Sequence, residues 1–206
     1  MGLKESIKSS PILKKLAFWM LTPKNQARPR LWIRVFVNPF KHKKGRGSLI
    51  RRRVRMDVMP FSNFVLGKNS TIEDFSTINN GVGDVIIGDR TRIGLGNTLI
   101  GPVTVGNDVM FAQNVVASGL NHGYEDINTP IADQPVITIP INIEDEVWIG
   151  ANAVITAGVT VGKHSIVAAG CVVVKNVPAY SIVGGNPGRI LKQYNIKTKE
   201  WEKPLK

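Results

Sequence analysis

The sequence predicts an all-β protein built as a β-solenoid, in which short strands coil around one long core. Three observations support this prediction: an aliphatic residue recurs at every sixth position, glycine often follows it, and a small or β-branched residue stands three positions after that glycine. A six-residue period is neither the 3.6-residue period of a helix nor the two-residue alternation of a half-buried strand. The alternative, an ordinary β-sandwich, has no reason to hold this period in phase.

The repeat runs through two long stretches of the chain. Ten of its twelve key positions hold Ile, Leu or Val; the positions are Ile87, Ile93, Leu99, Val105, Phe111, Ala117 and then Ile143, Ile149, Ile155, Val161, Val167, Val173. An earlier run at Leu66, Ile72 and Ile78 has the same period but slips by three residues around 81–85. Each hexad is expected to form one strand and one turn, so that three hexads close a triangular coil of about 18 residues. The aliphatic side chain points inward, and the glycine relieves crowding at the corner.

The predicted organisation has three parts. Residues 1–60 form a basic, partly helical N-terminal extension, residues 61–190 form the solenoid with an extruded loop at 118–142, and residues 191–206 form a short tail. Residues 1–55 hold 16 of the 27 Lys and Arg residues but one acid, Glu5, so the net charge of +12 comes from the extension. Residues 12–20 predict a short amphipathic helix, and residues 31–37 fit a strand or a helix.

Three hypotheses account for the basic extension. It could cap the first coil with its charge left in solvent, or residues 1–55 could contact an anionic membrane surface. The third hypothesis, nucleic-acid binding, fits the basic runs with interleaved aromatic residues but has no recognised motif to support it. The apolar stretch 12–21 is too short to span a bilayer and is interrupted by Lys14 and Lys15.

The repeat stops after Ala117 and resumes at Ile143, and His122 stands where the chain leaves the coil. A solenoid accommodates a long insertion by extruding it as a loop, and long loops in compact domains are often functional. Histidine titrates near neutrality and is the commonest general base. His122 is therefore the candidate catalytic residue, against the alternative that it only hydrogen-bonds the loop.

The hexads and this Asn-His pair resemble the hexapeptide-repeat acyltransferases over roughly residues 66–192, most closely the colanic-acid-type and sugar O-acetyltransferase branch. The resemblance implies a left-handed parallel β-helix, a homotrimer with sites between subunits, and acetyl-coenzyme A as the acyl donor. It also implies that His122 is the base for direct transfer to a sugar hydroxyl, in surface polysaccharide or lipopolysaccharide assembly. No metal is expected.

The same resemblance assigns a donor site near the C-terminal end of the solenoid. Ala151 and Ala169 would leave room for the pantetheine arm, with Trp148 beside it, and Val174 and Lys175 would approach the adenosine. Arg189 and Lys192 would bind the phosphates, which suits cationic side chains. The family often has Ala-Gly-Asn-Pro-Ala-Arg where this chain has Gly-Gly-Asn-Pro-Gly-Arg at 184–189, and Val174 replaces a frequent threonine.

Weaker assignments complete the predicted site. Asn79, Asn80, Asn97 and Asn121 are candidate acceptor contacts, although asparagine also stacks well in solenoid turns. Cys171 occupies an inward small position and is expected to be structural, because buried thiols are inert. His42 and His164 are expected to be solvated.

Two alternatives to sugar O-acylation remain open at the level of the sequence. One is N-acylation of an aminosugar or antibiotic, and the other is a non-catalytic β-helix scaffold. A scaffold needs neither the His122 loop nor the Arg189 turn. Carbonic anhydrases of this fold need three histidines at one site, which this chain does not offer. A single cysteine, with no secretory signal found, predicts a cytoplasmic protein, with the inner face of the membrane as a further possibility.

Overall fold

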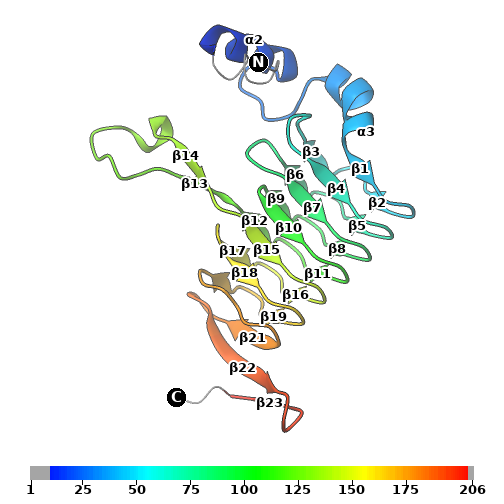
Figure 1. The fold of residues 1–206 in the computed structure, drawn as a ribbon, viewed down its shortest axis with the longest axis vertical. Coiled ribbons are helices and arrows are strands. Elements are labelled where there is room, and N and C mark those ends of the chain that lie inside the picture. Colours follow the sequence, from blue (N-terminus) through cyan, green and yellow to red (C-terminus); the bar gives the residue numbers. More distant parts are fainter. Residues whose placement is uncertain (1–9, 204–206) are drawn as a thin grey trace.

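A computed structural model describes residues 10–203, and these residues form a β-solenoid of six three-stranded coils with helices at its N-terminal end (Figure 1). The all-β solenoid predicted from the sequence is confirmed. Three parallel sheets form the walls. Sheet A contains β1 (Lys43–Lys44), β4 (Phe64–Leu66), β7 (Val85–Ile87), β10 (Val103–Val105), β15 (Ile141–Ile143) and β18 (Thr160–Val161).

The other two walls follow in the same order along each coil. Sheet B contains β2 (Leu49–Ile50), β5 (Thr71–Ile72), β8 (Arg92–Ile93), β11 (Met110–Phe111), β16 (Trp148–Ile149), β19 (Ile166–Val167) and β21 (Ser181–Gly184). Sheet C contains β3 (Arg55–Asp57), β6 (Thr77–Asn79), β9 (Thr98–Ile100), β12 (Val116–Ser118), β17 (Val154–Ile155) and β20 (Val172–Val173). An antiparallel hairpin of β22 (Arg189–Asn195) and β23 (Glu200–Glu202) extends sheet B beyond the last coil.

The core is a stack of the sixth-position residues. All twelve aliphatic positions predicted to face inward are at most 3% exposed, and so are the earlier Leu66, Ile72 and Ile78. Corresponding positions pair directly between coils, as where Leu99 pairs with Ile78 on one side and with Ala117 on the other. The slip predicted near residues 81–85 is also present, because Ile86 pairs with Val65, 21 residues away, but with Thr104, 18 residues away.

Glycine follows the inward aliphatic residue because the coils nearly touch there. A Cβ at Gly88 would lie 2.5 Å from the carbonyl oxygen of Gly106, and one at Gly150 would lie 2.6 Å from the backbone nitrogen of Ala169. Such contacts with backbone leave no room for a side chain. The crowding inferred from the sequence is therefore present at these corners.

The parallel strands begin at Lys43, before the boundary at 60/61 expected from the sequence. The first coil is hard to detect because Lys44 and Met56 pair with the inward aliphatic residues of the next coil, and only Ile50 keeps an aliphatic side chain at this position. Before it lie α2 (Pro11–Leu21), a π-helical turn η1 (Ile33–Val37) and α3 (Asn38–Lys41). The helix expected over 12–20 is present as α2, and the 31–37 segment is helical rather than extended.

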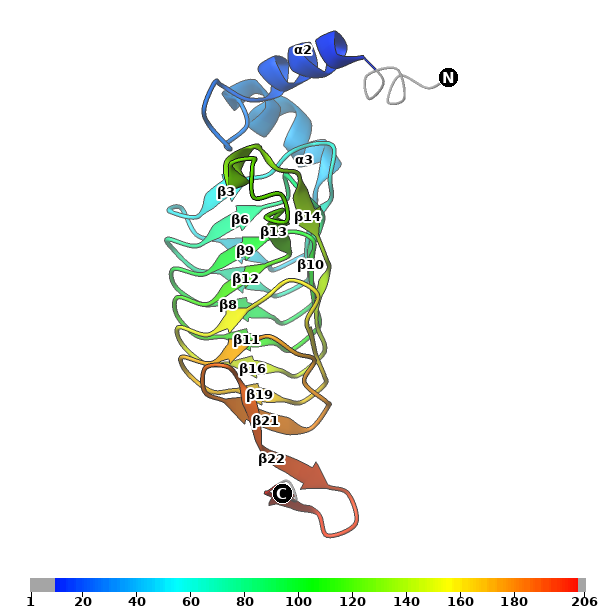
Figure 2. The same cartoon turned by 90° about the vertical axis from the view of Figure 1, so that its left-hand side faces the viewer.

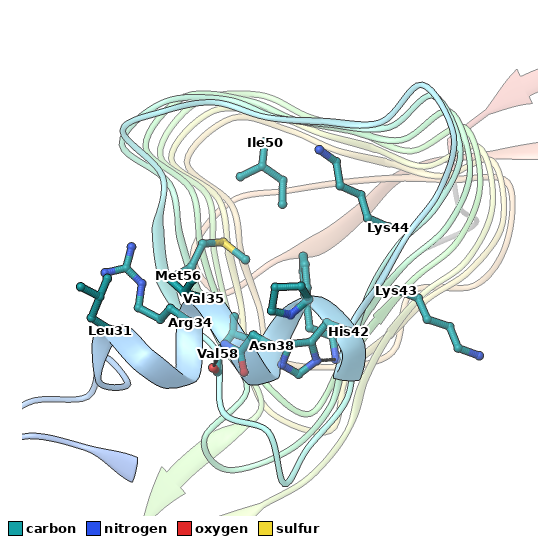
Figure 3. A pocket seen from close by; sticks show the side chains of 12 residues that line it. Leu31, Arg34, Val35, Asn38, His42, Lys43, Lys44, Ile50, Met56 and Val58 are labelled. Atoms are coloured by element: carbon teal, nitrogen blue, oxygen red, sulfur yellow. Dashed lines mark hydrogen bonds between the residues drawn. The ribbon is translucent and has the colours of Figure 1, made fainter. Parts of the chain in front are cut away.

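The η1–α3 segment lies across the open end of the first coil (Figure 3). Ile33 is 1% exposed, the Asn38 side-chain amide donates to the Val58 carbonyl at 2.8 Å, and the Phe64 backbone N–H donates to His42 Nδ1 at 3.2 Å. A hollow of about 520 Å³ remains beneath it, lined by apolar residues such as Val35, Ile50 and Val58 and by polar ones that include Arg34 and His42. This segment therefore covers the end of the solenoid, where the strands of the first coil have unpaired edges.

Candidate functional site

His122 lies on a hairpin that leaves the solenoid at the edge between sheets C and A (Figures 1 and 2). Strand β13 (Leu120–His122) pairs antiparallel with β14 (Val136–Thr138), and His122 is directly opposite Val136. The imidazole is exposed and has no hydrogen-bond partner within residues 10–203. The backbone of His122 is thus held by strand pairing while its ring stays open to a ligand.

The root of the hairpin is fixed by close backbone packing. Gly119 donates its N–H to the Ile100 carbonyl at 2.9 Å and accepts from Ile139 at 2.9 Å. A Cβ at Gly119 would lie 2.6 Å from the Pro102 carbonyl oxygen, so only glycine fits where the chain turns out of the coil. The hairpin therefore leaves the solenoid in a defined direction, with His122 three residues beyond its root.

The tip of the hairpin is organised around Asp126. Its carboxylate accepts from the Thr129 hydroxyl at 2.6 Å and from the Asn128 backbone N–H at 2.9 Å, and these hydrogen bonds lower the pKa of Asp126. The Gln134 side-chain amide donates to the Asp126 carbonyl at 2.8 Å and closes the tip. A short helical turn, η2 (Ile131–Asp133), lies between them. The long loop predicted from the sequence is therefore an ordered arm.

A second group of predicted residues lies on the edge between sheets B and C. Ala151 and Ala169 occupy equivalent corners of successive coils, and the Gly170 N–H donates to the Ala151 carbonyl at 2.8 Å. The 185–188 turn closes the same edge, because Gly185 accepts from Val172 at 3.0 Å and Gly188 donates to Val172 at 2.8 Å. Exposed Arg189 follows this turn, so the structure brings the two alanines and the arginine to one edge.

The other residues predicted to bind coenzyme A lie apart from this edge. Val174 and Lys175 are exposed and follow β20 at the edge between sheets C and A, two coils beyond the root of the hairpin. Neighbouring strands lie about 4.8 Å apart, so the two levels are separated by about 10 Å along the solenoid. Trp148 is 47% exposed on the outer face of sheet B, and Lys192 is exposed on β22. In one chain, His122 therefore does not meet the Ala151–Ala169–Arg189 edge, because sheet C lies between them.

Two of the four asparagines that were expected to contact an acceptor, Asn97 and Asn80, have a structural role instead. Asn97 is fully buried, donates to the Gly94 and Ala112 carbonyls and accepts from the Val115 N–H. Asn80 is fully buried and bonds in the same way to Met59 and Ser62. Their hydrogen-bonding groups satisfy the solenoid backbone, which corrects the prediction that they face a ligand. Asn79 is half-buried and accepts from Gly81 N–H, and Asn121 is exposed on β13.

The other singled-out side chains lie away from this region. Cys171 is fully buried in the core, as expected, and burial raises the pKa of its thiol. His164 is exposed at a corner, also as expected, 2.9 Å from a carboxylate oxygen of Glu146. His42 is not solvated as predicted, because it is half-buried beneath the η1–α3 segment, and this burial lowers its pKa. Residues 10–203 contain no group of three His, Cys, Asp or Glu side chains arranged to hold a metal ion.

The sequence did not reveal the strand β14 or the apolar surface of the arm. Ile127 is 94% exposed, and Ile131, Val136 and Ile137 are exposed as well. A signal was available in the β-branched run Val136-Ile-Thr-Ile139, which favours a strand. Four exposed aliphatic side chains on one projecting arm are unusual for a surface that stays in water.

Comparison with known proteins finds similarity to acyl-transferring enzymes over parts of the chain. A family model described as the hexapeptide repeat of succinyl-transferase matches residues 84–116 and 140–175. A 2,3,4,5-tetrahydropyridine-2,6-dicarboxylate N-acetyltransferase of Clostridium perfringens is 54% identical over 67 residues, or 32% of this chain and 28% of that protein. The galactoside O-acetyltransferase of Escherichia coli is 33% identical over 99 residues, or 48% of each chain. The chain thus spans less than half the length of these curated relatives.

Solved structures with the same fold include both an N-acyltransferase and an O-acetyltransferase. AntD, an N-acyltransferase from Bacillus cereus solved with dTDP and 3-hydroxybutyryl-CoA, has a TM-score of 0.65 at 20% identity, covering 78% of this chain and 88% of that one. A maltose O-acetyltransferase from Clostridium difficile has a TM-score of 0.52 at 23% identity, covering 91% and 87%. At these identities the likeness establishes the fold alone. The comparisons do not distinguish the sugar O-acetyltransferase branch, which the sequence motifs suggest, from N-acyltransferases.

Proposed function

We propose that this chain, which has the repeat and the fold of the hexapeptide-repeat acyltransferase family, transfers an acyl group from acyl-coenzyme A to an acceptor hydroxyl. The observation that carries the proposal is the exposed imidazole of His122, held by strand pairing at the one large break in the repeat. A buried or internally bonded histidine at this place would point to a structural role. Acetyl-coenzyme A is the proposed donor and a sugar is the proposed acceptor.

The chemistry is a direct transfer within one ternary complex. The acceptor oxygen attacks the thioester carbonyl carbon while His122 removes the hydroxyl proton, so that no free alkoxide forms. The tetrahedral intermediate then expels the coenzyme A thiolate, which takes the proton from the imidazolium. Ester and thiol are the products, and His122 returns to its starting state. No covalent acyl-enzyme is needed, and the buried Cys171 thiol is in no position to form one.

The proposal requires a second copy of the chain to complete the site. His122 lies on one edge of the prism and the Ala151–Ala169–Arg189 edge lies on another, so the arm of one copy has to reach the donor edge of a neighbour. In a homotrimer, the threefold symmetry would form three equivalent sites of this kind, one at each interface. The exposed aliphatic side chains of the arm support such packing, because they would be buried against the neighbouring copy.

Basic residues near the donor edge suit a polyanionic cofactor. Arg189 follows the turn that ends the edge, and Lys175 and Lys192 are exposed near the same end of the solenoid. A guanidinium group binds phosphate oxygens through paired hydrogen bonds, and an ammonium group adds a point charge. The small side chains of Ala151 and Ala169 leave room at this corner, so that a pantetheine arm would lie against backbone amide and carbonyl groups.

N-acylation of an amine is the second candidate, and a specific observation favours it. A region of 67 residues is 54% identical to an N-acetyltransferase. A panel of paired acceptors that differ by hydroxyl or amine at one position separates the two activities. Product mass gives the acyl group, and hydroxylamine treatment removes an ester but leaves an amide.

The test of the proposed base is His122→Ala, with His164→Ala, at a second exposed histidine on another corner of the solenoid, as the control. Thiol release from acetyl-coenzyme A in the presence of acceptor should fall by at least about 100-fold in His122→Ala. Oligomer mass and thermal unfolding should not change, because the side chain is exposed and unbonded. Undiminished turnover in a folded variant would rule out the role of His122.

The donor edge is tested separately by binding. Arg189→Ala should weaken coenzyme A binding about tenfold, and Lys175→Ala should have a smaller effect. Lys203→Ala, at another exposed lysine, is the control. Dephospho-coenzyme A and pantetheine are the matched ligands, since they lack successive phosphates. An unchanged dissociation constant for coenzyme A in Arg189→Ala would refute the phosphate assignment.

A further inference from the structure

The N-terminal helix α2 has a broad apolar face that is largely exposed, and only the Trp19 ring on it is in contact with another described side chain in an aromatic or cation–π pair, the Arg30 guanidinium 5.3 Å from its centroid. None of its residues is buried, and its side chains are those that a globular protein normally places inside. The apolar face of α2 consists of Ile12, Leu13, Leu16, Trp19 and Met20, each at least 43% exposed. Phe18, on the opposite side, packs edge-on against Phe61 with ring centroids 6.2 Å apart. The helix is thus attached through one side and presents the other to its surroundings.

A second apolar region adjoins α2 at the same end of the solenoid. Phe36 is 70% exposed and Phe40 is 89% exposed, although both belong to the η1–α3 segment that covers the first coil, and Leu31, just before this segment, is 70% exposed. A shallow hollow of about 620 Å³ lies beside them, lined by Pro23, Arg30, Leu31, Trp32, Val35 and Phe36. The buried side of this segment accounts for its capping role, but its aromatic side chains Phe36 and Phe40 stay largely exposed in the described chain.

The same end of the molecule is strongly basic. Residues 10–55 contain 14 Lys and Arg residues and no Asp or Glu. Three of them, Arg28, Arg51 and Arg55, form ion pairs with acids of the solenoid. The other eleven have no carboxylate within 4.0 Å in the part of the chain that the structure describes. Apolar and unpaired cationic side chains therefore share one surface.

The orientation of α2 suits contact with a flat surface. In two views at right angles, α2 lies across the extreme N-terminal end of the solenoid rather than along it (Figures 1 and 2). It has 11 residues, and no helix in residues 10–203 is long and apolar enough to cross a bilayer. A short helix with an apolar face and with lysines outside that face, here Lys14 and Lys15, is typical of interfacial binding parallel to a bilayer.

We propose that this end of the protein, through the apolar face of α2 and the surrounding bases, docks on an anionic lipid bilayer. A bilayer satisfies both features at once, because its acyl boundary receives the apolar side chains and its headgroups neutralise the bases. A second copy pairing through this end would bring two sets of unpaired cations together. A nucleic acid would neutralise the charge but leave Ile12, Leu16 and Met20 in water.

Flotation of the full chain with phospholipid vesicles tests the proposal. The protein should float with vesicles containing about 30% phosphatidylserine, bind phosphatidylcholine vesicles much more weakly, and dissociate as salt rises to about 1 M. Ile12→Glu should weaken partitioning at least about tenfold, because one buried aliphatic side chain contributes about that factor. Ile196→Glu is the matched control, since Ile196 is 76% exposed at the opposite end and Ile12 is 79% exposed.

The charged component is tested by Lys14→Gln with Lys15→Gln, against Lys197→Gln with Lys199→Gln. The first pair should weaken binding to anionic vesicles, and the second should not. Equal binding of Ile12→Glu and Ile196→Glu, or no binding of the unmodified protein to anionic vesicles, would overturn the proposal. A duplex DNA that binds the protein equally well with and without Ile12→Glu, in the absence of vesicle binding, would assign the surface to nucleic acid instead.

Discussion

Replacing one inward leucine tests whether the stack of sixth-position residues stabilises the solenoid. Leu99 is fully buried in β9, between Ile78 of one neighbouring coil and Ala117 of the other. Leu99→Ala would place two alanines next to each other in the stack. Because Ala117 has no side chain that could move into the space, the cavity would stay largely unfilled.

The expected cost follows from this lack of relaxation. Buried leucine-to-alanine changes cost about 2–5 kcal/mol, with the larger values at sites that cannot collapse. We therefore expect a loss of about 3–5 kcal/mol for Leu99→Ala. Leu95→Ala is the matched control, since Leu95 lies four positions away and is 45% exposed. Its loss should be about 1 kcal/mol or less, because much of that side chain remains in water.

Urea unfolding followed by far-ultraviolet circular dichroism measures both variants. The Leu99→Ala midpoint should fall by roughly 1–2 M and the Leu95→Ala midpoint by a few tenths of that. Repeating each titration at two protein concentrations separates unfolding from dissociation of an oligomer. Equal losses for the two variants would refute the assignment of the sixth position to the core.

Further expected outcomes concern the corners and two titrating groups. A Cβ at Gly88 would lie 2.5 Å from a backbone carbonyl oxygen of the next coil, so Gly88→Ala should cost about 1–3 kcal/mol in urea unfolding, whereas Gly81→Ala, which meets only a side-chain tip at 3.0 Å, should cost much less. Because burial raises the pKa of Cys171, a disulfide reagent should label it slowly in the native protein and rapidly in urea, and prompt native labelling would contradict its buried position. The hydrogen bond with His164 lowers the pKa of Glu146, so the stability it contributes is present above the ordinary carboxyl pKa and is lost as pH falls through the lowered value. The midpoint difference between the unmodified protein and Glu146→Gln should therefore shrink on acidification, and a constant difference from neutral to acidic pH would argue against this linkage.

The solenoid could be predicted from the sequence because each coil repeats the same packing requirements at the same spacing. Ile149 and Val167 face the core because a six-residue step returns the chain to an equivalent place, and Gly150 follows because the next coil leaves no room for a Cβ. The first coil escaped prediction because strands such as β1 are made of lysines, and only pairing with β4 makes them part of the wall. Capping of that coil likewise depends on contacts such as Asn38 with Val58, which are 20 residues apart.

The period, the inward residues and the place where the chain leaves the coil at His122 could all be read from the sequence, because they depend on local spacing. Which polar residues are available to a ligand depends on contacts between coils: Asn97 resembles a site residue in the sequence but bonds to the backbone of the next coil. The tertiary structure also separated His122 from the Ala151–Ala169 edge, since sequence order does not say on which side of a triangular prism a corner lies. The edge on which a residue lies depends on how the three sheets close into a prism, and not on its separation from other residues along the chain.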